Sequence, residues 1–296
     1  MNSRVLLNLG LLVLAAIAGL VMVYLPGLEK PATPIALTSL KPAQVTHILM
    51  QRTGQADIRL VKQQQGWFMT APLTLSANTA SVDSLLELAQ IESQQQFNAR
   101  AQDLGKFNVA EPRVRVRLND EEIAFGGTEP LQQRRYVLVN NTVHLINEVV
   151  YDSLLSAPTV WVSSALLPPA SQLSSIELPG ITLFKQSNGS WKLTPPQNNI
   201  SSDTINSLVD EWTHAQAQQV KPYTTGTAHG KVLLHLQSSK NPISFDIQAR
   251  TPELILARPD LGVQYHLPAE LSDRLLKMPA PAVSSEAGDE TLPHTH

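Results

Sequence analysis

Three arginines alternate with apolar residues along one short segment, at a spacing suited to binding an anionic partner. Arg113, Arg115 and Arg117 occupy every second position of the stretch RVRVRL. Successive side chains of a strand point to opposite faces, so the three guanidinium groups would share one face and the apolar residues the other. This face is a candidate docking site for a partner. The alternative is a solvated sheet face, balanced in a hairpin by the acids at 120–122.

No other set of reactive residue types matches a recognised catalytic or metal-binding pattern. The pair Gly126 and Gly127 suggests a phosphate-binding loop, but no Lys-Ser/Thr ending follows, and a hairpin turn explains the pair better. The histidines form no HExxH arrangement, and His294 and His296 could hold a metal only loosely in a tail. GxSxG and SxxK motifs are absent, and the chain has no cysteine. We therefore predict no catalytic residue, no cofactor and no metal site.

Two tryptophans, Trp67 and Trp191, follow glycine turns in similar sequence surroundings. An exposed indole at such a turn could stack on a sugar ring. Because both segments keep the tryptophan, a place in a hydrophobic core is the simpler interpretation.

The overall composition bounds the function. The chain has 296 residues, 22 Lys+Arg against 25 Asp+Glu, and a net charge of -3. Near-neutral charge gives no general electrostatic reason for nucleic-acid binding, so we expect no nucleic-acid partner. The length suits one large domain or two ordinary ones.

The N-terminus carries an uncharged apolar run over residues 5–25, long enough to cross about 30 Å of bilayer as a helix. We predict a single transmembrane anchor over 1–25, with a cleaved signal peptide as the alternative. The short tail with Arg4 should stay in the cytoplasm, which predicts a bacterial inner-membrane protein with its C-terminal domains in the periplasm. Residues 26–43 are proline-rich and predict a stalk, and 279–296 predict a disordered tail.

Self-similarity organises the rest of the chain. The segment DIRLVKQQQGWFMTAP at 57–72 resembles GITLFKQSNGSWKLTPP at 180–196. A helical stripe recurs after each segment, and apolar alternation follows both stripes. We therefore predict an α+β fold of two tandem, structurally similar repeats with mainly antiparallel sheets. Each repeat would have two or three short strands, a helix, four more strands and a short closing helix. The predicted bounds are 44–165 and 173–278, with a linker at 166–172.

These motifs resemble a bacterial envelope family known as domain of unknown function 4340. The resemblance rests on the span, the strand pair ending in GWFMTAP, and the stretches DLGKFNVAEPRVRVRL and GGTEPLQQRRYVLVNNTVHLI, and it covers roughly residues 40–160 at good quality. It implies a membrane-tethered periplasmic protein, often encoded beside an ABC transporter of the gliding-motility type, with no known active site. The usual tyrosine-glycine-leucine before the proline is replaced here by residues 106–109, which puts a role of that turn in doubt.

We expect a non-enzymatic accessory or scaffold protein of a membrane assembly of the ABC-transporter type, acting through contacts with an envelope protein partner. The alternative is a periplasmic module that binds glycan or peptidoglycan near Trp67 or Trp191. An enzyme with an unrecognised site is a third reading. Exposure of the two indoles discriminates the first two, because a buried ring cannot stack on a sugar.

Overall fold

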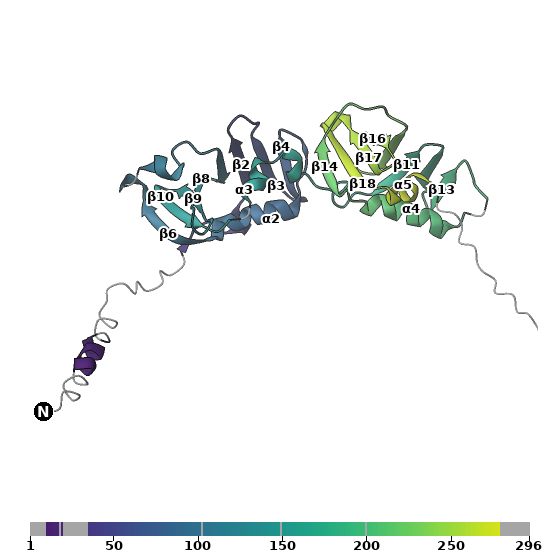
Figure 1. Cartoon of the computed structure of the whole chain (residues 1–296). Helices are drawn as coiled ribbons and strands as arrows, with labels where there is room; N and C mark the ends of the chain where they lie inside the picture. Colours follow the sequence, from purple (N-terminus) through teal and green to yellow (C-terminus); the bar gives the residue numbers. More distant parts are fainter. Residues whose placement is uncertain are drawn as a thin grey trace, which may run out of the picture.

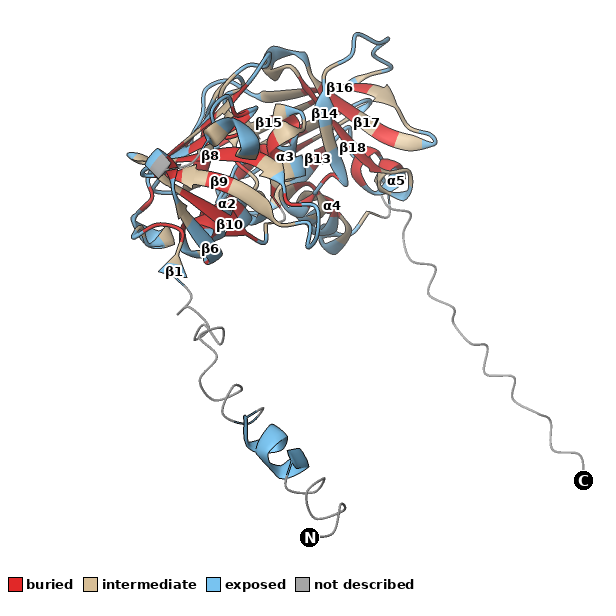
Figure 2. Cartoon of the chain, turned by 60° about the vertical axis from the view of Figure 1, so that its left-hand side comes forward, coloured by how far each residue is buried: buried red, intermediate tan, exposed pale blue. Residues whose placement is uncertain are grey.

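Two antiparallel sheets, one after the other along the chain, form the body of the protein (Figure 1). The structure is a computed structural model that describes residues 10–17, 19, 35–101, 103–148, 150–198 and 200–278. Helices accompany each sheet, and buried residues line the strands of both (Figure 2). The predicted α+β class with mainly antiparallel pairing is confirmed.

The first unit, residues 35–161, holds one ten-stranded sheet. Its strands are β1 (Ile35–Ala36), β2 (His47–Arg52), β3 (Ile58–Gln63), β4 (Gly66–Ala71), β5 (Leu75–Ser76), β6 (Glu92–Asn98), β7 (Val114–Leu118), β8 (Glu121–Thr128), β9 (Arg135–Val139) and β10 (Thr142–Ile146). They lie in the order β1-β6-β10-β9-β8-β7-β2-β3-β4-β5. Its helices are α2 (Thr79–Glu87) and α3 (Tyr151–Leu155), with 3-10 turns η1 (Pro42–Gln44), η2 (Leu88–Gln90), η3 (Ala99–Ala101), η4 (Leu104–Phe107) and η5 (Pro158–Trp161).

The second unit, residues 173–278, holds one eight-stranded sheet. Its strands are β11 (Leu173–Leu178), β12 (Ile181–Lys185), β13 (Trp191–Thr194), β14 (Gln219–Pro222), β15 (Lys231–Leu236), β16 (Ile243–Ala249), β17 (Glu253–Arg258) and β18 (Val263–Pro268). They lie in the order β13-β12-β11-β15-β16-β17-β18-β14. Its helices are α4 (Ser202–His214) and α5 (Glu270–Leu276), with the 3-10 turn η6 (Pro259–Leu261).

The two sheets have the same strand order. Reading the second sheet backwards, β14-β18-β17-β16-β15-β11-β12-β13 matches β6-β10-β9-β8-β7-β2-β3-β4 position by position. In both units five strands, not the predicted four, follow the helix. The missed strand of the first unit, β6, reads ESQQQFN and carries too few apolar residues to show the alternation expected of a half-buried strand.

Each long helix begins at a side-chain cap and buries the predicted stripe. Asn78 accepts a hydrogen bond from Ser81 N before α2, and Ser201 accepts one from Thr204 N before α4. The buried stripe residues are Val82, Leu85 and Leu86 in α2, and Ile205, Leu208 and Trp212 in α4. These stripes pack into the core of their own unit.

The first unit begins earlier than predicted. Residues 35–43 were expected in the stalk, yet Leu37 is buried in the core, and its backbone N–H donates to Ile91 O at 2.8 Å. Strand β1 pairs with β6, whose edge would otherwise be open. Edge pairing and burial of one leucine therefore bring the end of the proline-rich segment into the fold.

Several predicted segments lie outside the described residues. They are most of the anchor at 1–25, residues 26–34 of the stalk, and the tail at 279–296; residues 10–17 are described and are helical. Among the helices that the structure describes, none combines the length and apolar character needed to cross a membrane.

The segment between the two units is hydrogen-bonded to both. Ser163 N donates to Ser76 O in the first unit at 2.8 Å. Ala217 N of the second unit then donates to Ser164 O at 2.8 Å, and Leu166 N donates to Ala215 O at 3.1 Å. Main-chain pairing on both sides makes residues 162–166 a structural joint. Leu166 and Leu167, the first two residues of the predicted linker at 166–172, are buried as well, so we call residues 162–167 the joint.

Candidate functional site

Two of the three arginines of the predicted docking face are paired with one acid. Arg117 Nη2 lies 2.8 Å from Glu122 Oε2, and Arg115 Nε lies 3.6 Å from Glu122 Oε1. Glu122 faces Arg117 across the hairpin of β7 and β8, and the apolar partners on β7 are buried. Arg113 precedes the strand and is exposed. The alternation is confirmed, and the hairpin pairing accounts for Arg115 and Arg117; docking by this face stays a prediction.

Replacing Arg113, Arg115 and Arg117 together by Gln should change the free energy of unfolding little, because exposed ion pairs contribute less than about 1 kcal/mol each. Urea unfolding checks this. If the face docks a partner, the triple variant should also weaken a salt-sensitive association, chiefly by slowing encounter. If the triple variant associates as strongly as the parent at every salt concentration, the arginines form only a solvated face.

The glycine pair lies inside strand β8, not in a hairpin turn as predicted. The register of β8 against β9 shifts between Phe125 and Thr128, and the C-terminal end of η4 and the residues after it lie against the strand there. A Cβ on Gly126 would overlap Phe107 O and lie 2.5 Å from Val109 Cγ1. The pair therefore serves a close backbone approach, which sequence alone does not separate from a turn.

Gly126→Ala should lower the free energy of unfolding by about 1–3 kcal/mol, because the new methyl group overlaps a backbone carbonyl that cannot move freely. The matched control is Gly105→Ala, where the nearest atom is the Asp103 carboxylate at 3.2 Å. Chemical denaturation of both variants measures the difference. Equal stability of the two would contradict the close approach.

The two glycine-turn tryptophans occupy equivalent strand positions. Trp67 on β4 pairs with Lys62, and Trp191 on β13 pairs with Lys185. Trp67 is 7% exposed and belongs to the first core, whereas Trp191 is half-buried at the edge of the second. The predicted core role is confirmed for Trp67, whose ring has no face free for a sugar.

The histidines that the structure describes do not converge on a metal site. In the described part of the chain, no three or more His, Cys, Asp or Glu side chains cluster as metal ligands. His294 and His296 lie outside the described residues. Burial lowers the pKa of His144, which hydrogen-bonds Ser93, and His266 pairs with Glu253 at 2.7 Å.

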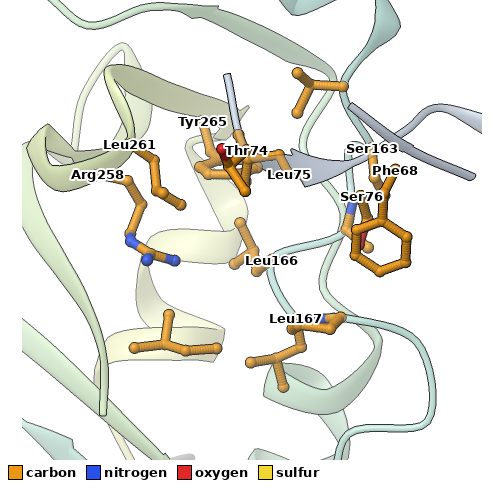
Figure 3. Close-up of a pocket in the computed structure, with 14 residues that line it drawn as sticks. Phe68, Thr74, Leu75, Ser76, Ser163, Leu166, Leu167, Arg258, Leu261 and Tyr265 are labelled. Carbon is orange, nitrogen blue, oxygen red and sulfur yellow. Dashed lines mark hydrogen bonds between the residues drawn. The ribbon is translucent and has the colours of Figure 1, made fainter. Parts of the chain in front are cut away.

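A cavity of about 310 Å³ opens at the joint between the two units (Figure 3). The first unit contributes Phe68 and Leu75, the joint contributes Leu166 and Leu167, and the second unit contributes a wall from β16 to β18. Apolar side chains dominate the lining, while Thr74, Ser76 and Ser163 add hydroxyl groups. An apolar cavity between units with a few polar groups is the usual form of a binding site.

Arg258 contributes a guanidinium and Tyr265 contributes a phenol to the lining of the cavity. Figure 3 shows the Arg258 side chain reaching toward Leu166. Asp260 holds two of its nitrogens, at 3.0 Å to Nε and 2.7 Å to Nη2, and this pairing lowers the pKa of Asp260. Tyr265 is 3% exposed, and burial raises the pKa of its phenol. A guanidinium and a phenol beside apolar walls are groups that can hold a ligand through hydrogen bonds.

A second candidate contact site, for which the sequence shows no recognised motif, is the connection between β8 and β9. Leu131 at its tip is 89% exposed, more than any other large apolar side chain of the described residues. The loop beneath it is held tightly: the Glu129 carboxylate accepts from Gln132 N at 3.0 Å and lies 3.4 Å from Arg134 Nε. Both side chains of that ion pair are nearly buried. We name residues 129–134 the Leu131 loop.

The fold defines a two-unit α+β protein with a largely apolar cavity at the joint between its units. The chain belongs to the family described as "Domain of unknown function (DUF4340)", whose profile matches residues 67–232. The match crosses from the first unit into the second, further than the predicted coverage of 40–160. No curated protein and no solved structure matches the chain.

Proposed function

We propose that this protein is a non-enzymatic, membrane-anchored scaffold component of a bacterial envelope assembly, and that it works by contacting another protein. The Leu131 loop carries the proposal. A leucine held 89% exposed on a loop fixed by a nearly buried ion pair needs little further ordering of the loop to contact a partner. A fixed loop conformation favours binding to a protein pocket, because the pocket fits only one shape of the loop. Insertion into a fluid bilayer does not require the loop to have one fixed shape.

The corresponding connection of the second unit supports this interpretation. Strands β16 and β17 are joined by residues 250–252, Arg-Thr-Pro, which present no large apolar side chain. Since the two units otherwise share their strand order, the longer Leu131 loop is an addition to the first unit rather than a requirement of the fold.

The position of the loop suits a partner at the membrane. Ile35, Ser93, Ile146 and Arg135 form one row across β1, β6, β10 and β9. With strands about 4.8 Å apart, the base of the Leu131 loop lies roughly 14 Å from the point where the chain enters the fold. The ten residue steps from the apolar run to Ile35 can extend at most about 35 Å. An anchor over 1–25 would thus keep the loop near the bilayer.

The finer parts of the proposal rest on sequence and topology together. The equal strand orders and the matched tryptophan positions support two repeats that arose by duplication. The uncharged run at 5–25 supports a single span in the inner membrane, with the two units in the periplasm. Genes for an ABC transporter of the gliding-motility type beside this one would fit the assembly that we propose.

The experiment compares the full chain with Leu131→Asp in native membrane extracts. We expect the variant to fold as the parent does and to lose its place in a larger complex on native gels, because a charge cannot enter an apolar pocket without a partner. Ser187→Asp, which adds the same charge on an exposed turn of the second unit, is the matched control. An unchanged complex with Leu131→Asp would contradict the contact.

A further inference from the structure

On the second unit's wall of the joint cavity, Arg258 and Tyr265 have hydrogen-bond donors that are not fully used. Within the described residues, no hydrogen bond reaches the Tyr265 hydroxyl or Nη1 of Arg258, since Asp260 engages the other edge of the guanidinium. Asp260 itself is 57% exposed at its side chain, whereas Arg258 is only 12% exposed. A nearly buried cation therefore faces the cavity while its counter-charge sits in solvent.

Aromatic packing fixes both donors. The Tyr265 ring meets Phe245 edge to face at 5.9 Å, and the Arg258 guanidinium lies 5.5 Å from the same Phe245 ring. A tyrosine phenol keeps its proton at neutral pH, and burial raises the pKa of Tyr265 further, so its hydroxyl can donate a hydrogen bond. A guanidinium and a phenol held on one ring form a preorganised pair of donors.

The rest of the cavity would receive an apolar body. Phe68, Leu75, Leu166, Leu167 and Leu261 supply walls from both units and from the joint. A volume of about 310 Å³ is at the small end of ligand sites, enough for a short chain rather than a folded domain.

We propose that the joint cavity binds a carboxylate with a short apolar body, its oxygens meeting Arg258 and Tyr265. Two sources share this chemistry: a free short-chain organic acid and the C-terminus of a polypeptide that ends in apolar residues. The inference goes beyond the scaffold role and does not depend on the Leu131 loop.

The test is calorimetry on the full chain with four probes: octanoate, octanol, acetyl-Ala-Val-Leu-Leu with a free carboxylate, and the same peptide as its amide. At least one acid should bind more than about tenfold tighter than its neutral counterpart, since charge-assisted hydrogen bonds contribute that much or more. Tighter binding of octanoate than of the peptide acid assigns the site to a free acid, and the reverse assigns it to a polypeptide end. No binding at about 10 mM, or equal binding of acid and neutral probes, overturns the proposal.

Variants separate ligand contact from structure. Tyr265→Phe removes one hydroxyl and should weaken acid binding about tenfold, and Arg258→Gln should weaken it by about tenfold to hundredfold. Asp260→Asn should strengthen acid binding, because it removes the competing carboxylate and leaves the guanidinium in place. Weaker acid binding by Asp260→Asn would contradict the proposal even if Arg258→Gln failed to fold. Leu131→Asp should leave acid binding unchanged, so the scaffold role and this site can fail separately.

Discussion

Trp212→Ala should lower the free energy of unfolding of the second unit by about 3–5 kcal/mol. Trp212 is fully buried on α4 and packs 6.3 Å from the Phe245 ring. Its indole Nε1 donates to Leu275 O at 2.8 Å, which ties α4 to α5. The substitution therefore leaves a large cavity and an unpaired carbonyl together. Urea unfolding followed by circular dichroism measures the loss.

Trp161 provides the matched comparison. It is equally buried in the first unit, but its Nε1 has no hydrogen-bond partner in the described part of the chain. Trp212→Phe should therefore cost about 1–3 kcal/mol more than Trp161→Phe, since only the first change orphans a buried acceptor. Equal losses from the two Phe variants would show that the hydrogen bond to Leu275 contributes nothing.

Arg52→Ala should destabilise the first unit by about 3 kcal/mol. Arg52 is 5% exposed, and it donates from Nη1 to Ser156 O at 2.7 Å and from Nη2 to Ala56 O at 2.6 Å. Burial lowers the pKa of this guanidinium and Asp57 opposes that shift. Removing the side chain leaves two carbonyls unpaired, one of them at the end of α3.

The control for this substitution is Arg59→Ala on β3, an exposed arginine, which should change stability by less than about 0.5 kcal/mol. The denaturation midpoints of the two variants, compared at equal m-value, measure the difference in their free energies of unfolding. If Arg52→Ala lowered the free energy of unfolding no more than Arg59→Ala does, the hydrogen bond from Arg52 to Ser156 O would not contribute to stability.

Much of the fold follows from patterns within single segments. The strand class, both helical stripes and the equivalence of Trp67 with Trp191 were predictable, because alternation and the 3.6-residue period are local signals. Strand β6 was not predictable, because its mostly polar sequence shows no alternation. It is a strand because its backbone pairs with β1 and β10. The entry strand β1 is two residues long and exists because β6 offers it an edge.

The candidate sites show the limit of sequence patterns more clearly. The arginine face is predictable because its three residues occupy alternate positions of one short segment. The cavity is not, because Phe68, Leu166 and Arg258 come from segments far apart in the chain. In the sequence, the Leu131 loop shows only a weak signal: Pro130 and Leu131 lie between Glu129 and Arg134. Its exposure depends on where the Glu129 carboxylate turns, and no spacing rule predicts that.

Site-specific photocrosslinking in intact cells tests the central claim, that the first unit contacts a protein through its exposed leucine. With a photoreactive phenylalanine in place of Leu131, we expect one discrete protein adduct of the full chain. The same probe at Ser187 should give none, and Glu129→Gln should reduce the adduct from position 131 because the loop loses its clamp. Crosslinks to lipid alone, or equal adducts from both positions, would contradict the account.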